Sequence, residues 1–174
     1  MKKMVLSLLV ENTSGVLSRV AGLFSRRGYN IDSLTVGVTE NPKLSRMTVV
    51  VNGDTQILEQ IQNQLQKLED VVEIQKLPPG HSVCRELVLV RVKADASERM
   101  AVIAVANCYR AQIVDTAPDS LMIELTGNPA KLDAFINILN DFTILEFVRT
   151  GITGLRRSLA TAGDEDSWEN SDEE

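Results

Sequence analysis

Residues 11–32 read ENTSGVLSRVAGLFSRRGYNID and hold the side chains best suited to ligand binding. Asn12, Ser14 and Gly15 precede an amphipathic run, and Asn30 follows the glycine that ends it. The first amides of a helix lack intrahelical acceptors and carry the positive end of its dipole, so they can hold a carboxylate. Gly15 leaves those amides accessible because it has no side chain. The stretch predicts either caps and turns alone or a small anion-binding corner.

Catalytic chemistry is hard to find elsewhere in the chain. His81 is the single histidine and lies in a Pro/Gly stretch with no second ligand or base nearby in sequence. Metal sites and nucleophile–base pairs need more such groups, held in place. The chain has neither a Walker-type loop nor a dinucleotide fingerprint. We therefore predict that it is not an enzyme and that it binds no metal or cofactor of its own.

Composition and charge narrow the class of protein. The 174 residues are 44% apolar and 24% charged, which is typical of a globular chain with one domain or two small ones. A net charge of -6 argues against a general electrostatic grip on nucleic acid or acidic membranes. No apolar run approaches the ~20 residues that span a bilayer, and two cysteines suit a reducing compartment. We expect a cytoplasmic or organelle-internal protein without nucleic-acid or membrane partners.

The elements that must position the opening stretch follow one plan, which occurs twice. Alternation and helical spacing predict strand–helix–strand–strand–helix–strand in each half. In the first half these elements cover residues 4–11, 16–27, 31–38, 44–52, 55–68 and 71–77. In the second half they cover residues 84–93, 97–107, 111–117, 120–127, 131–140 and 144–151. This βαββαβ order is ferredoxin-like, so we predict an α+β fold of two such units.

Local signals mark the boundaries of these units. Asp54 or Thr55 can cap the second helix, and Ser97 the third. Prolines and a glycine make residues 78–83 a linker between a domain at 1–77 and another at 84–158. Gly151–Gly154 reads as a turn.

Two surfaces remain open to interpretation. Residues 159–174 form an acidic tail that we predict to be disordered, although Trp168 could instead anchor it to a partner. The second face of the first strand, with Val5, Ser7 and Leu9, is too apolar to stay in water if helices cover only the other face. A second chain that packs on this face would bury it.

An RNA-recognition motif shares the βαββαβ order but needs aromatic residues on its inner strands, which are missing here.

Three segments closely resemble the regulatory (small) subunit of acetolactate synthase, also called acetohydroxyacid synthase. They are ENTSGVLSRVAGLFSRRGYNIDSLTVG, LSRMTVVVNGD and LEQIQNQLQKLEDVVEI. The resemblance extends from Met1 to about Ser158 and includes KLDAF at residues 131–135. It implies an N-terminal ACT domain, which is an amino-acid-binding βαββαβ module, followed by an ACT-like domain.

The resemblance implies a non-catalytic partner of a large subunit. In this family the large subunit carries thiamine diphosphate and Mg, with FAD as a further candidate, and condenses pyruvate with a second 2-oxo acid. The small subunit raises its activity and confers feedback inhibition by valine, often also by leucine or isoleucine. The effector lies between the ACT domains of a homodimer. The compartment would be bacterial cytoplasm or plastid stroma.

By position, Asn12, Gly15 and Asn30 match the effector-site residues of the family. The amides near Gly15 would hold the amino acid's carboxylate, while Asn12 and Asn30 would orient its polar end, with Asn30 contributed across the dimer. Ser14 is a further hydrogen-bonding candidate, and Leu17 a weaker candidate for the side-chain pocket. Two alternatives remain: a free-standing ACT-type sensor that controls a transcriptional or signalling partner, and a purely structural subunit with a degenerate site.

Overall fold

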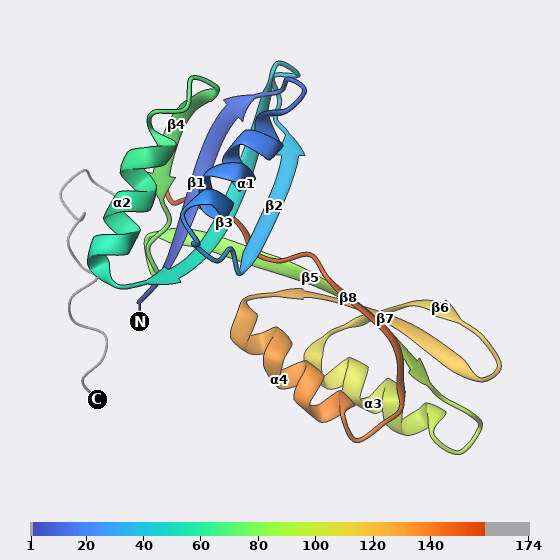
Figure 1. Cartoon of the computed structure of the whole chain (residues 1–174). Coiled ribbons are helices and arrows are strands. Elements are labelled where there is room, and N and C mark those ends of the chain that lie inside the picture. Colours follow the sequence, from blue (N-terminus) through green and yellow to red (C-terminus); the bar gives the residue numbers. More distant parts are fainter. Residues whose placement is uncertain (1, 159–174) are drawn as a thin grey trace. The chain divides into compact units, whose positions relative to one another are not determined.

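The computed structural model describes residues 2–158 of the chain, and their contacts form two compact units (Figure 1). Unit 1 consists of residues 2–84 and 152–158, and unit 2 of Arg85–Gly151. The predicted acidic tail and Trp168 lie outside the described residues. The helices within the described range have eleven residues each, and none of them is long and apolar enough for a bilayer crossing.

Unit 1 has the predicted βαββαβ order, in which two helices cover one face of a four-stranded antiparallel sheet (Figure 1). The strands lie in the order β2-β3-β1-β4. The elements are β1 (Lys2–Glu11), α1 (Val16–Arg26), β2 (Ser33–Val38), β3 (Leu44–Gly53), α2 (Thr55–Leu65) and β4 (Val71–Lys76). Because β1 and β2 run parallel, α1 returns in the opposite direction, and its two ends lie at opposite ends of the sheet.

The core of unit 1 is built from the apolar residues that recur at strand spacing in β1 and at helical spacing in α1 and α2. Every second residue of β1 from Met4 to Val10 is buried beneath the helices. The helices contribute residues at three- and four-residue spacing, among them Val20 and Phe24 of α1. As predicted, Asp54 caps α2, because its carboxylate accepts a hydrogen bond from the Ile57 amide at 2.8 Å. This core fixes α1 against the sheet.

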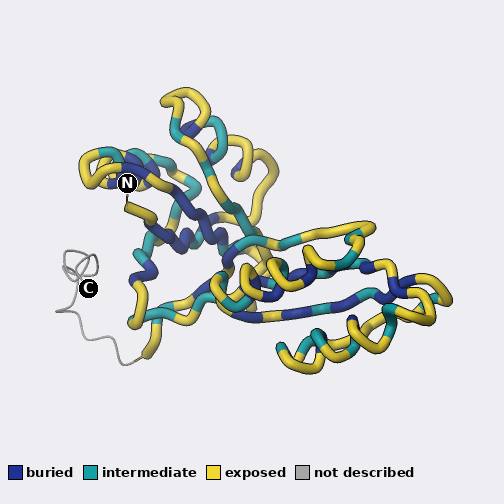
Figure 2. The backbone as a smooth tube through the Cα atoms, turned by 90° about the horizontal axis from the view of Figure 1, so that it is seen from below, coloured by how far each residue is buried: buried dark blue, intermediate teal, exposed yellow. Residues whose placement is uncertain are grey.

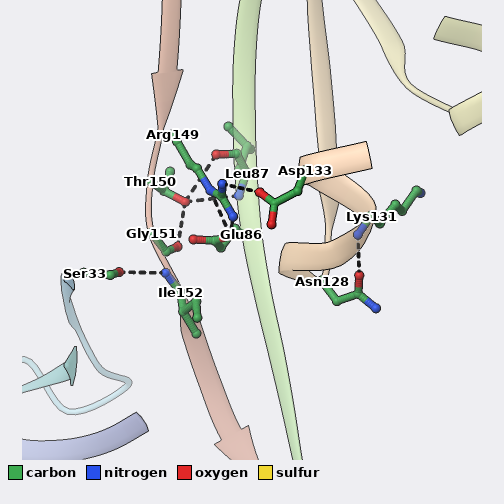
Figure 3. Close-up of polar contacts among 10 residues, drawn as sticks. All are labelled: Ser33, Glu86, Leu87, Asn128, Lys131, Asp133, Arg149, Thr150, Gly151 and Ile152. Carbon is green, nitrogen blue, oxygen red and sulfur yellow. Dashed lines mark hydrogen bonds and ion pairs between the residues drawn. The ribbon is translucent and has the colours of Figure 1, made fainter. Parts of the chain in front are cut away.

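Unit 2 repeats the arrangement with strand order β6-β7-β5-β8. Its elements are β5 (Ser82–Lys93), which begins in unit 1, α3 (Arg99–Tyr109), β6 (Gln112–Thr116), β7 (Ser120–Gly127), α4 (Pro129–Leu139) and β8 (Ile144–Arg149). Asn128 caps α4 through the Lys131 amide at 2.8 Å (Figure 3). At α3 the predicted cap is wrong: Asp95, not Ser97, accepts from the amides of Ser97 and Glu98. These hydrogen bonds lower the pKa of Asp95, the hydroxyl of Ser97 contributing most.

Two ion pairs that share Arg149 join three elements of unit 2 (Figure 3). Arg149 of β8 contacts Glu86 of β5 through Nε and Nη2, and Asp133 of α4 through Nη1 at 2.7 Å. Glu86 keeps only 5% of its surface exposed, so its charge depends on the guanidinium. The hydrogen bond to Glu86 is the main cause of the raised pKa of Arg149.

The chain returns to unit 1 after unit 2 and adds a strand that the sequence did not reveal. β9 (Thr153–Arg156) pairs with β5. Just before it, the Ile152 amide donates to Ser33 Oγ at 3.0 Å (Figure 3). Thr35 Oγ1 donates to the Ile152 carbonyl at 3.0 Å. Gly151 has the positive φ of a turn, but the predicted turn over Gly151–Gly154 is wrong from Thr153 onward. Four residues with a glycine among them carry too little periodicity to reveal a strand.

This return covers the second face of β1. Ile152 and Leu77 form a small buried cluster with Val5 and Val50, and Ser7 is 1% exposed while it accepts a hydrogen bond from Arg46. Figure 2 shows the buried residues concentrated along the strands. Val5 and Ser7 are therefore buried by their own chain and need no second chain to cover them, whereas Leu9 is half-buried.

The contacts also divide the chain differently from the predicted ranges. Leu77 and Pro78 are buried, and Ser82 already begins β5, so residues 78–83 belong to the body of unit 1. Residues 152–158, which were expected in the second domain, belong to unit 1 as well.

Candidate functional site

Residues 12–15 form the turn between β1 and α1, and together with Val16 and Leu17, the first two residues of the helix, they are here called the α1 corner. Gly15 is the residue before the helix and has a φ of 88°, a left-handed conformation in which other residues are strained. Among the described residues no side chain caps α1, so the interpretation in which Asn12 or Ser14 serves as a helix cap is wrong. The first amides of α1 are therefore without a side-chain acceptor at the protein surface.

Asn12 connects the α1 corner to the hairpin between β2 and β3. Its Nδ2 donates to the Pro42 carbonyl at 2.9 Å, and its Oδ1 accepts from Ser45 Oγ at 3.1 Å. Its backbone amide donates to the Lys43 carbonyl at 2.7 Å. A side-chain amide has two N–H groups and an oxygen with two lone pairs, so Asn12 keeps one donor and one acceptor for a further partner.

An ion pair that the sequence did not predict lies beside the α1 corner. Arg19 of α1 donates from Nε and Nη2 to the two carboxylate oxygens of Asp70, at 2.5 and 2.7 Å. The carbonyl of Asp70 accepts from the Glu11 amide at 2.9 Å, so Asp70 is fixed to the end of β1. The hydrogen bond lowers the pKa of Asp70 and raises that of Arg19, and the nearby charge of Glu11 raises the latter further.

Arg19 also contacts Gly15. A Cβ atom placed on Gly15 would lie 2.9 Å from Arg19 Nη1, closer than real side chains come. The spacing of four residues along a helix could have suggested this contact. The partner Asp70 could not be found from local spacing, since it lies 51 residues further along the chain.

Asn30 lies at the other end of α1. Its Nδ2 donates to Asp32 Oδ1 at 2.9 Å, and Asn52 donates to the second oxygen of the same carboxylate. Eleven residues of α1 separate this group from the α1 corner by about 16 Å. One chain therefore does not bring Asn30 to Asn12 and Gly15, and a site that uses all three needs a second copy.

The remaining candidates lie on the surface of the α1 corner. Ser14 is exposed, and Leu17 keeps 46% of its surface in solvent, a large exposure for leucine. Both are accessible to a ligand, and their predicted roles stay predictions. Within residues 2–158, His, Cys, Asp and Glu form no group of three or more that could hold a metal ion.

Comparisons with known families match both parts of the chain. Residues 6–73 match the family described as "AHAS small subunit-like ACT domain", and residues 85–158 match "Small subunit of acetolactate synthase". Together these two matches cover most of the described chain, including the α1 corner and all of unit 2.

Curated relatives and a solved structure give the same result. The "Probable acetolactate synthase small subunit" of Methanothermobacter thermautotrophicus is 48% identical, over 90% of this chain and 94% of that protein. The "Acetolactate synthase isozyme 3 small subunit" of Escherichia coli is 47% identical, over 88% of this chain and 94% of that protein. The crystal structure of the acetolactate synthase small subunit from Thermotoga maritima has a TM-score of 0.84 and 38% identity, over 90% of this chain and 98% of that chain.

Proposed function

The chain belongs to the family of acetolactate synthase small subunits, and on that premise we propose that it binds and activates a catalytic large subunit and makes it sensitive to L-valine. The match of both units to this family, over nearly the full length of the relatives, is the observation that carries the proposal. The condensation of pyruvate, with its thiamine diphosphate and Mg, would belong to the large subunit.

The effector site of the proposal is the α1 corner. Amino acids present a carboxylate, and the first amides of α1 offer donors at the positive end of a helix dipole. Gly15 adds no side chain of its own at these amides, and the nearest side-chain atom above it is Nη1 of Arg19. Asn12 keeps a donor and an acceptor for the ligand, and Leu17 offers apolar surface for a branched side chain.

The other half of the site would come from a second copy. Asp32 holds the Nδ2 group of Asn30, which leaves the Asn30 oxygen as an acceptor for an ammonium group. Two ACT domains related by a two-fold axis would bring Asn30 of one copy toward the α1 corner of the other. The effector would then stabilise one arrangement of the pair, and a coupling free energy of about 1–3 kcal/mol would be enough to regulate the large subunit.

Reconstitution tests this function. The large subunit from the same organism would be assayed for acetolactate formation with and without this chain, and with increasing L-valine. Calorimetry of the chain with L-valine would run beside it. We expect the chain to raise the activity and L-valine to lower it again.

Two aspartate variants provide the matched control. Gly15→Asp places a carboxylate beside Arg19 and the first amides of α1, where it competes with the ligand. Gly80→Asp is the control, because Gly80 has a similar positive φ but open space around it. The first should still activate the large subunit but ignore L-valine, and the second should behave as native.

Two other outcomes would favour the alternative functions. Binding of L-valine without any stimulation of acetolactate synthesis would favour the free-standing sensor. Stimulation with neither binding nor inhibition by L-valine, L-leucine or L-isoleucine would favour a structural subunit with a degenerate site.

A further inference from the structure

Arg19 is bound to Asp70 through only one edge of its guanidinium. The Asp70 carboxylate takes Nε and Nη2, the two nitrogens along one edge of the planar group. A guanidinium has five N–H donors, and Nη1 with its two N–H groups points away from this edge. This nitrogen lies over Gly15, 2.9 Å from where a Cβ would be.

From this geometry we propose that Arg19 is a binding residue of the effector site, with Nη1 contacting the carboxylate of the amino acid, and that Asp70 is its positioning residue. The inference rests on the proposed function, because it assigns a role within that same site. Nη1 lies over Gly15, the residue directly before the first amides of α1, so one carboxylate bound there would accept from both. Charge-assisted hydrogen bonds of this kind are about twice as strong as neutral ones.

Asp70 holds the guanidinium in place before the ligand arrives. Its side chain is only 18% exposed, and its backbone carbonyl is bonded to the Glu11 amide at the end of β1. Arg19 itself is 47% exposed, so it can reach a ligand from solvent. A fixed guanidinium loses less side-chain entropy on binding than a mobile one, and a lysine could not make the same two-pronged contact with Asp70 while it faces Gly15.

Arg19 also offsets the negative charge of the carboxylates beside it. Asp70 and Glu11 are both close enough to raise its pKa, so two carboxylates border the α1 corner. Without the cation, these carboxylates would repel the carboxylate group of the ligand. Loss of Arg19 should therefore weaken the binding of a ligand that has a carboxylate far more than that of a ligand without one.

The test compares L-valine with L-valinamide, which has the same side chain and ammonium group but an uncharged amide in place of the carboxylate. Calorimetry would use the full-length native chain and its Arg19→Gln, Asp70→Asn and Arg91→Gln variants. Arg91→Gln removes an equal charge from an ion pair with Glu146 in unit 2 and is the matched control.

We expect Arg19→Gln to weaken L-valine binding roughly 10- to 100-fold, the range for hydrogen bonds to charged groups, and to leave L-valinamide binding within about twofold. Asp70→Asn should give an intermediate loss for L-valine, because the guanidinium remains but is no longer fixed. Arg91→Gln should bind both ligands as the native chain does. The ratio of the two affinities is the decisive quantity, because general damage to the fold would weaken both ligands together.

Equal weakening of both ligands in Arg19→Gln, or no weakening at all, would overturn the inference while native binding of L-valine upholds the proposed function. If the native chain bound none of L-valine, L-leucine and L-isoleucine, alone or with the large subunit, the proposed function would fail and the inference with it.

Discussion

Gly15 and Arg19 constrain each other at the α1 corner. The glycine adopts a conformation that other residues avoid, and the space above it is occupied by a guanidinium nitrogen. A side chain at position 15 would therefore cause two separate effects, backbone strain and displacement of Arg19. These effects can be measured apart.

Gly15→Ala and Gly80→Ala separate them. Both glycines have φ above 80°, but only a Cβ at Gly15 meets another atom within 4 Å. Each substitution should lower the free energy of unfolding by about 1–2 kcal/mol, from the left-handed backbone. Urea denaturation would measure this loss, and only Gly15→Ala should also weaken L-valine binding in calorimetry, by roughly tenfold. Equal binding by both variants would show that the position of Arg19 is irrelevant to the ligand.

Single residues were predictable where their role is local. Gly15 could be singled out in the sequence, because a glycine directly before an amphipathic run is typical of a turn that leads into a helix. The partners of Asn12 and Arg19 were not predictable, since Ser45 and Asp70 come near only when β3 and β4 pair with β1. Ser14 shows the opposite error: a residue suited to capping does not cap when a left-handed glycine follows it.

Elements of this protein are joined by polar contacts as well as by cores. In unit 2, Arg149 binds β8 to β5 through Glu86 and to α4 through Asp133. The two carboxylates differ in exposure, 5% for Glu86 and 57% for Asp133. Their contributions to stability should differ accordingly.

Arg149→Leu should lower the free energy of unfolding of unit 2 by about 3 kcal/mol, because it leaves a buried carboxylate without its cation. Asp133→Asn should cost less than about 1 kcal/mol, as for other exposed pairs. Chemical denaturation would measure both losses. A double variant, Glu86→Met with Arg149→Leu, should recover much of the first loss, and a double variant as unstable as Arg149→Leu would contradict this role of the buried charge.

The type and order of the elements were predictable because nearly every strand and helix keeps the spacing of apolar residues that is typical of its type. β1 alternates with one fully buried face, and α1 buries residues at helical spacing. β9 was not predictable, because its stability comes from pairing with β5 and from the hydroxyls of Ser33 and Thr35 beside it, not from its own four residues.

The whole molecule is built so that unit 2 interrupts unit 1. The polypeptide leaves unit 1 at Cys84 and returns at Ile152, whose side chain packs on Val5 and Val50. No local pattern marks such a return: the predicted second domain, like the family match over residues 85–158, continues across it.

Ile152→Ala tests this topology. Ile152 is 5% exposed, so its truncation should cost about 2–5 kcal/mol. The loss should appear in unit 1, as faster amide hydrogen exchange in peptides from β1 and β3, while α3 and α4 keep native rates. Leu155→Ala, at a position 57% exposed, should change little and is the matched control. Faster exchange confined to unit 2 would refute the placement of Ile152 in unit 1.

The interrupted topology also sets an order of events on the ribosome. Synthesis proceeds from the N-terminus at roughly 5–20 residues per second. Residues 85–151 are contiguous, so unit 2 can fold as soon as they emerge. The face of the unit 1 sheet that holds Val5 and Val50 is covered only when Ile152 emerges, and Ile152 is synthesised after the whole of unit 2. The unit that is translated first is therefore completed last, and until then a chaperone has an apolar strip to bind.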